Sequence, residues 1–299
     1  MTTRIGDLGH SNLLIGYLER TQRRVRDAQL DIASGSRAQR WEEIADRAAL
    51  LVATREQRQL TDRFAAENEK VRGRLLATDA ALAGIGELAE RFRTLLVARL
   101  GEPGQSTMPL DTEAEQIARE LAGLLNRQLD GRYLFAGSRI ETAPVELPDP
   151  LPTTVDPNLY YRGDALVPTV RADRETQITY GTTAAAEPFA QLFAALGQAR
   201  VAHLAGDRAG LEQALGLATR ALEGVAEERG RLGVAAARLE SIVDGQRGAL
   251  VYLDEMIGSI ADTDLAEAAA RLARDQATLE ASYLVVARLA ALSLADYLR

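Results

Sequence analysis

The sequence predicts a mainly α-helical protein: an elongated antiparallel helical bundle or coiled coil with a small antiparallel β domain inserted at its middle. Three observations predict this fold. Apolar residues recur at coiled-coil spacing near both ends of the 299-residue chain. Long stretches lack proline and are rich in Ala, Leu, Arg and Glu, which favour helices. Seven of the nine prolines are confined to residues 139–188, which interrupts the helical pattern there.

The first helix is predicted from a narrow apolar seam in the N-terminal region. Its members recur every three, four or seven positions: Leu14, Leu18, Val25, Ala28 and Ile32. So narrow a stripe is typical of a coiled-coil contact, so we expect a partner helix. The turn-forming sequence Ser-Gly-Ser-Arg at residues 34–37 ends this helix.

Two more helices are predicted before the middle of the chain. Residues 42–100 contain no proline, and at 1.5 Å per residue they form a rod of roughly 80 Å. The next helix runs from about Asp111, which supplies an N-cap with acidic residues in the first turn, to Leu129.

The proline-rich insertion carries three short β-prone runs. They lie at residues 159–163, 168–172 and 177–181, and proline or glycine bounds each one. This pattern predicts a small β-rich domain over residues 139–188.

Helical sequence returns at about residue 189. A seam runs from Leu222 to Ile260, with Arg229 and Gln246 as polar interruptions. Ala-Asp-Thr-Asp at 261–264 breaks the register, and a second seam follows with one member per seven residues: Leu265, Leu272, Leu279 and Val286.

The helices flank a single insertion, so those on its two sides must pack together to bury their seams. We therefore expect three parts. Residues 1–36 with 262–299 form terminal coiled-coil helices, 37–138 with 189–261 form a helical rod domain, and 139–188 form the β insertion. The terminal seams serve either as intramolecular core or as surfaces for self-assembly.

No constellation in the sequence predicts catalysis, a metal site or a cofactor. The two histidines, His10 and His203, lack partners at metal-ligand spacing, and the chain has no cysteine. The carboxylates Glu42, Glu43 and Asp46 fit a solvated helix N-terminus better than an acid–base pair. We therefore expect a protein that is not an enzyme.

Charge and hydropathy disfavour two classes of partner. The net charge of −8 argues against nucleic acid and against anionic membranes, and the arginines of residues 19–27 are interpreted as a charged flank of the first seam. No apolar run is long enough to span a bilayer, and the N-terminal sequence is unlike a cleaved signal peptide.

Three stretches resemble the flagellin superfamily and, within it, the hook-associated protein 3 family of hook–filament junction proteins. They are QLDIASGSRAQRWEEIADRAALLVATREQRQL (29–60), LNRQLDGRYLFAGSR (125–139) and EASYLVVARLAALSLADYLR (280–299). The middle stretch carries the family motif that opens the central insertion: Asp130, Gly131, Arg132, Tyr133, Leu134, Phe135 and Gly137.

The resemblance implies a flagellin-like structural subunit that joins hook to filament. Such a protein is exported to the extracellular flagellum through the type III flagellar export apparatus, without a cleaved signal peptide, and an export chaperone assists it. It self-assembles into a ring through its terminal helices and contacts hook-associated protein 1 and flagellin. Two alternatives stay open at this point: a flagellin that builds the filament itself, and a cytoplasmic helical scaffold.

Overall fold

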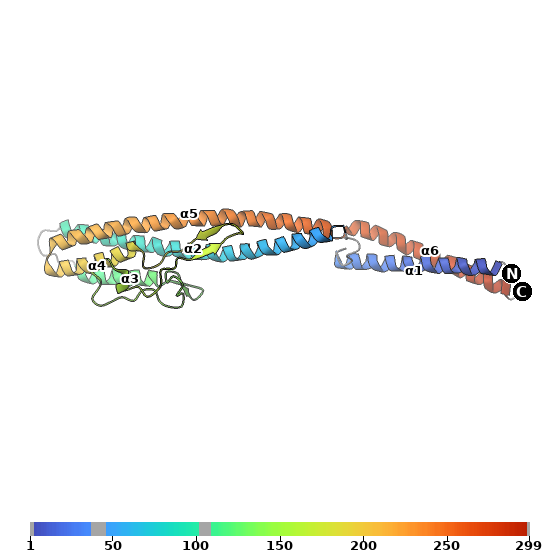
Figure 1. The fold of residues 1–299 in the computed structure, drawn as a ribbon, viewed down its shortest axis with the longest axis horizontal. Helices are drawn as coiled ribbons and strands as arrows, with labels where there is room; N and C mark the ends of the chain where they lie inside the picture. The colour runs from blue at the N-terminus through green and yellow to red at the C-terminus, as the bar shows by residue number, and fades with distance from the viewer. Residues whose placement is uncertain (1–2, 37–45, 102–108, 298–299) are drawn as a thin grey trace. The chain divides into compact units, whose positions relative to one another are not determined.

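The protein is described by a computed structural model that covers residues 3–36, 46–101 and 109–297, and most of these residues are helical (Figure 1). The α-helices of the described residues are α1 (Thr3–Ser34), α2 (Ala48–Gly101), α3 (Leu110–Leu125), α4 (Glu187–Ala205), α5 (Arg208–Ala261) and α6 (Leu265–Tyr297). Two antiparallel sheets of two strands each complete the fold. The predicted mainly α fold class with a small antiparallel β component is confirmed.

The chain divides into two compact units. The terminal unit comprises Met1–Gln59 and Leu250–Arg299, and the central unit comprises Leu60–Ala249. Helices α2 and α5 contribute to both units. The helix breaks predicted near residues 34–37 and 261–264 are confirmed, because α1 ends at Ser34 and α5 ends at Ala261.

The core of the central unit lies where α3 and α4 pack against each other and against α2 and α5 (Figure 1). Helix α4 is apolar on nearly all sides, which suits a helix with buried neighbours around it. The largest fully buried side chains of this core include Phe92 from α2, Ile117 and Leu121 from α3, and Phe189 and Phe193 from α4.

The helix predicted from about Asp111 to Leu129 ends earlier than expected, so the prediction was wrong at this boundary. Helix α3 stops at Leu125, and Leu129 belongs to strand β1 (Gln128–Leu129), which pairs with β2 (Arg132–Tyr133). The two residues between the strands have positive φ, 52° at Asp130 and 74° at Gly131. An Asp-Gly pair in this conformation is favoured in two-residue hairpins, so residues on both sides of it must be extended.

The insertion is partly as predicted. Strands β3 (Thr169–Arg171) and β4 (Gln177–Thr179) form an antiparallel hairpin, with Val170 opposite Ile178. The run at 159–163 is not a strand: Pro157–Leu159 form a 3₁₀ turn, η2, and Tyr161 makes one isolated bridge with Val145.

The insertion does not build a core of its own. Tyr160, Val170 and Ile178 are buried in the same apolar cluster as Phe189 and Phe193. The Tyr160 ring lies 4.5 Å from the Phe193 ring, measured between centroids. The packing explains why the insertion needs little regular β structure: helix α4 supplies its apolar partner surface.

The two polar interruptions of the α5 seam have structural reasons. Arg229 pairs with Asp79 of α2, its Nε and Nη2 lying 3.0 and 3.3 Å from the carboxylate oxygens. Gln246 is buried with Asn68 of α2, and each side-chain amide donates a 2.8 Å hydrogen bond to the carbonyl oxygen of Ala172. Asn68 also donates to Gln246 Oε1 at 3.1 Å. This amide clamp fastens the β3–β4 hairpin to α2 and α5.

Candidate functional site: the terminal helix pair

The first and last helices of the chain lie side by side in the terminal unit and run antiparallel (Figure 1). Their join is held by the backbone. Ser36 forms a bridge with Asp262, the amide of Thr263 donates to the carbonyl of Gly35 at 2.9 Å, and Ser36 Oγ donates to the carbonyl of Ala261 at 3.0 Å. These bonds bring the start of α6 to the end of α1.

Two side-chain contacts further along the pair continue this alignment. Arg24 forms an ion pair with Asp275, with 3.3 Å between Nη2 and Oδ1. Gln22 Nε2 donates to the hydroxyl of Tyr283 at 2.5 Å. Because the two contacts lie eight residues apart on α6, a little over two turns, they set the register of α1 on α6.

The predicted α1 seam faces α6. Val25 is buried, and the other seam residues are half-buried: Leu14, Leu18, Ala28 and Ile32. Leu13, Ile15 and Tyr17 lie off the seam and are 52–61% exposed. The coiled-coil spacing therefore predicts the burial pattern of this helix well.

The predicted α6 seam agrees at three of four positions. Leu272, Leu279 and Val286 are half-buried, whereas Leu265 is 55% exposed. Leu265 is the first residue of α6, and the preceding Asp264 caps the helix by accepting from the amides of Ala266 and Glu267, each at 3.0 Å. Ala268, one turn later, takes the buried position instead.

The pair is poorly filled by its own residues. The seam includes polar or small side chains between the large ones, among them Thr21 on α1 and Asp275 and Ser282 on α6. Large apolar side chains remain exposed around it, such as Leu30, Tyr283 and Leu284. Two helices with one narrow seam are marginal by themselves, so this pair gains stability from any further surface that covers it.

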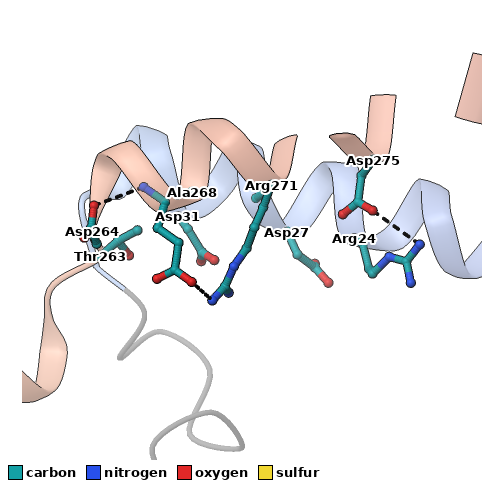
Figure 2. A pocket seen from close by; sticks show the side chains of 10 residues that line it. Arg24, Asp27, Asp31, Thr263, Asp264, Ala268, Arg271 and Asp275 are labelled. Carbon is teal, nitrogen blue, oxygen red and sulfur yellow. Dashed lines mark hydrogen bonds and ion pairs between the residues drawn. The ribbon is translucent and has the colours of Figure 1, made fainter. Parts of the chain in front are cut away.

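A groove of about 240 Å³ opens between the two helices near their join (Figure 2). Five carboxylates and two guanidinium groups line it: Asp27, Asp31, Asp264, Glu267 and Asp275, with Arg24 and Arg271. Glu267 pairs with Arg271 at 2.5 Å. The hydroxyl oxygen of Thr263, which also lines the groove, is buried and has no hydrogen-bond partner among the described residues. Because five carboxylates face only two guanidinium groups, the lining of the groove has a net negative charge.

The motif residues lie in the central unit and open the insertion. Asp130 and Gly131 form the hairpin turn, and Arg132 and Tyr133 form strand β2. Leu134 and Tyr133 are half-buried, and both their amides donate to backbone carbonyls, of Arg127 at 3.1 Å and of Ile140 at 2.9 Å respectively.

Phe135 and Gly137 complete the motif by anchoring it. The Phe135 ring is fully buried and meets Phe189 edge to face at 6.2 Å, and its carbonyl accepts from the amide of Ala184 at 2.9 Å. Gly137 has φ 71°, and a Cβ at this position would lie 2.2 Å from Asp164 Oδ1. Phe135 thus anchors the insertion on α4, whereas Tyr133 lies nearer the surface.

Asp164 is a residue that sequence reasoning missed. Its carboxylate accepts hydrogen bonds from the Ser138 hydroxyl, from the Ser138 amide at 2.9 Å and from the Leu166 amide at 3.0 Å. These bonds, first the one from the Ser138 hydroxyl, hold its pKa below the ordinary value of 3.8. The sequence signal was Gly137 beside Ser138, which marks a close backbone approach.

The residues weighed for chemistry are scattered. Glu42 and Glu43 lie outside the described residues, His10 lies in α1, and His203 accepts a 3.4 Å hydrogen bond at Nδ1 from Arg99 Nε. Within the described parts of the chain, no three His, Cys, Asp or Glu side chains group as a metal site. No described helix is both long and apolar enough to cross a membrane.

Comparisons with known proteins agree with this fold. Residues 215–298 match the family model of the bacterial flagellin C-terminal helical region. FlgL of Bacillus cereus has a similar structure, with TM-score 0.53 and 21% identity over 69% of this chain and 99% of that one. A candidate flagellar hook-associated protein of Vibrio parahaemolyticus gives TM-score 0.50 and 13% identity, over 71% and 96%. No curated protein matches by sequence.

These likenesses define the class of protein by its fold, which is the helical fold of flagellar hook-associated proteins. The flagellin-type C-terminal region coincides with much of α5 and nearly all of α6, so it includes one half of the terminal helix pair. The predicted resemblance to the flagellin superfamily is confirmed over residues 215–298, where the family model matches.

Proposed function

We propose that the protein is a structural subunit of the bacterial flagellum at the junction between hook and filament, and that it assembles through α1 and α6. Three observations support the proposal: the flagellin-type C-terminal region, the fold shared with FlgL, and the Asp-Gly-Arg-Tyr-Leu-Phe motif at the start of the insertion. The relative from Vibrio parahaemolyticus is itself described as hook-associated.

The incomplete burial of the terminal seam is the main support for assembly through α1 and α6. Leu272, Leu279 and Val286 remain half-buried against α1, and large apolar residues nearby stay exposed. A helix pair inside a finished core buries such residues. An assembly subunit leaves them to be covered by its neighbours, and the ordering cost of the helices is met on assembly.

The sequence resemblance supplies the partners of this proposal. Copies of the chain form a ring that contacts hook-associated protein 1 on one side and flagellin on the other. The chain reaches the cell exterior through the type III flagellar export apparatus, aided by an export chaperone. Its role there is mechanical, with no reaction catalysed and no cofactor bound.

A second candidate is flagellin itself, the filament subunit. The observation that favours it is the match of residues 215–298 to the flagellin C-terminal region. The motif at 130–137 and the sequence at 280–299 favour the junction protein.

The deciding experiment deletes the gene, images the cell surface and measures flagellin in the medium. A strain with the gene restored serves as the control. Bare hooks with flagellin monomers in the medium are expected for a junction protein. Bare hooks with no flagellin anywhere would make this chain the filament subunit. Normal flagella would contradict both assignments and favour a cytoplasmic scaffold.

A further inference from the structure

A small pocket lies in the central unit where α2 meets the motif hairpin and the end of the insertion. Its volume is about 60 Å³, and the described residues around it include two arginines, Arg74 and Arg132, and no carboxylate. Arg74 belongs to α2, and Arg132 belongs to β2 within the family motif. This arginine pocket therefore has a positively charged lining in a chain whose net charge is −8.

Neither arginine is neutralised within the described parts of its own chain. Arg74 Nη1 donates a 3.2 Å hydrogen bond to the hydroxyl of Tyr180, which is an uncharged acceptor. The side chain of Arg132 has no hydrogen bond or ion pair with any residue that the structure describes. The fold of one chain gives Phe135 of the motif its packing partner on α4, but it gives the Arg132 side chain none.

The walls of the arginine pocket are apolar and are held by backbone hydrogen bonds. Leu129, Ile140 and Pro168 are among the lining residues. The amide of Tyr133 donates to the carbonyl of Ile140 at 2.9 Å, and the amide of Tyr180 donates to the carbonyl of Pro168 at 3.0 Å. Apolar walls lower the local dielectric constant, so a hydrogen bond between an arginine and an anion is stronger here than on an open surface.

The size and the charge of the pocket suit the end of one acidic side chain. Arginine binds the two oxygens of a carboxylate with parallel N–H donors. A volume of about 60 Å³ holds only a few water molecules, which is room for a carboxyl group and its methylene but not for a nucleotide or a peptide segment. The apolar walls match the methylene, which a free inorganic anion lacks.

A second copy of the chain can supply such a side chain. Glu223 and Glu227 stand one turn apart on α5, where like charges repel each other, so a cation from another molecule stabilises both. Four exposed glutamates of the central unit have no ion pair among the described residues: Glu141, Glu223, Glu227 and Glu240.

We propose that the arginine pocket of one copy, through Arg74 and Arg132, binds an aspartate or glutamate side chain of a neighbouring copy. The inference rests on the proposed function, in which copies of this chain stand side by side in a ring. The pocket and the carboxylate are different surfaces of the chain, so the contact is heterologous and can repeat around a closed ring. The motif then joins subunits as well as opening the insertion.

Zero-length cross-linking tests the contact in flagella isolated from a deletion strain that carries the Arg132→Lys variant. A carbodiimide joins an amine to a carboxylate only where the two touch, and the natural chain has a single lysine, Lys70. We expect a dimer of this chain in which the new amine is joined to an aspartate or glutamate of the other copy. The control is Arg119→Lys, at an exposed arginine of α3 outside the pocket, and it should give roughly tenfold less dimer because proximity sets the reaction rate.

The cross-linking result separates the inference from the proposed function. No more dimer than in the control, an amine joined within its own chain, or a cross-link to a different flagellar protein would each overturn the inference. Absence of the wild-type chain from isolated flagella would contradict the proposed function and the inference together. Its presence without the expected cross-link would contradict the inference alone.

A footprint of the wild-type chain needs no substitution in the pocket. Phenylglyoxal modifies accessible arginines, and mass spectrometry compares the rates in the purified monomer and in isolated flagella. We expect Arg132 to react roughly tenfold more slowly in flagella, because a charged hydrogen bond must break first, while Arg119 changes less. An unchanged rate at Arg132, or equal slowing at both arginines, would overturn the inference.

Discussion

Arg24 and Asp275 form an ion pair in which the arginine is 58% exposed and the aspartate only 22% exposed. Asp275 occupies a seam position between Leu272 and Leu279, where an apolar residue would pack better. An exposed ion pair contributes only about 0–1 kcal/mol, so its main effect here is on alignment. A shift of α1 along α6 would leave a half-buried carboxylate without its partner, and the pair thereby selects one register.

The first prediction concerns the seam of α6. Leu279→Asp should unpair α1 from α6, because a second carboxylate then enters the seam next to Asp275. We expect faster hydrogen exchange and protease cleavage in both helices, with the central unit unchanged, and no assembled filaments. Leu284→Asp is the control for pairing, since Leu284 is 63% exposed. Normal filaments from the Leu279 variant would show that this seam is not used in assembly.

The second prediction concerns the amide clamp. Gln246→Ala removes one of two donors to the Ala172 carbonyl and should destabilise the attachment of the β3–β4 hairpin by about 1–3 kcal/mol. Hydrogen exchange over residues 169–179 should rise while exchange in α3 and α4 stays constant. Gln213→Ala, an exposed change on the same helix, should leave the hairpin protected. Equal exchange in the two variants would mean that the clamp does not hold the hairpin.

The third prediction concerns acid sensitivity. Hydrogen bonds lower the pKa of Asp164, first through the Ser138 hydroxyl, and that of Asp173, first through the Glu175 amide, below the ordinary 3.8. A pKa lowered by folding means that the carboxylate stabilises the fold above 3.8, and that this stabilisation is lost as the pH falls through the folded-state value. Exchange protection of the Glu175 and Thr176 amides should therefore decline below about pH 4.

A matched variant isolates the contribution of each carboxylate. Asp173→Asn should flatten the pH dependence at residues 173–176 and leave that of the Ser138 amide unchanged, because Asp164 still accepts from Ser138. If both segments kept their wild-type pH profiles in this variant, the acid response would have another source.

The fourth prediction separates backbone strain from steric clash at two glycines of the motif. Gly131 and Gly137 both have positive φ, but a Cβ meets nothing within 4 Å at Gly131 and meets Asp164 at Gly137. Gly131→Ala should cost about 1–2 kcal/mol from conformation alone, whereas Gly137→Ala should cost more and should release the Ser138–Asp164 contact. Denaturant unfolding of both variants gives the comparison, and equal losses would rule out the clash.

Much of the architecture was predictable because helices carry a periodic signal. Spacings of three and four residues identified the seams of α1 and α6, and the Ser-Gly and Asp-Thr-Asp breaks located their ends. The predicted burial of Leu265 was wrong because apolar spacing carries no information about helix caps. Asp264 caps the first turn of α6, and Leu265 lies outside the contact between α1 and α6.

The insertion was harder to predict because its order comes from distant partners. Tyr160 lies in a β-prone run, yet its hydroxyl donates to Ala184 and its ring packs on α4. The amide clamp and the groove likewise could not be predicted from the sequence, since each is formed by segments far apart in the chain. Gln246 showed only as an interruption, and its partner Asn68 lies 178 positions away.

The pairing of α1 with α6 also means that the terminal helix pair forms late in folding. The α1–α6 contacts join segments more than 200 residues apart in the sequence, because α1 ends at Ser34 and α6 begins at Leu265. Contacts of such large sequence separation form late in folding, because the intervening chain must first be ordered. A chain cut anywhere before Leu265 lacks the partner of α1, so we expect it to leave the α1 seam uncovered.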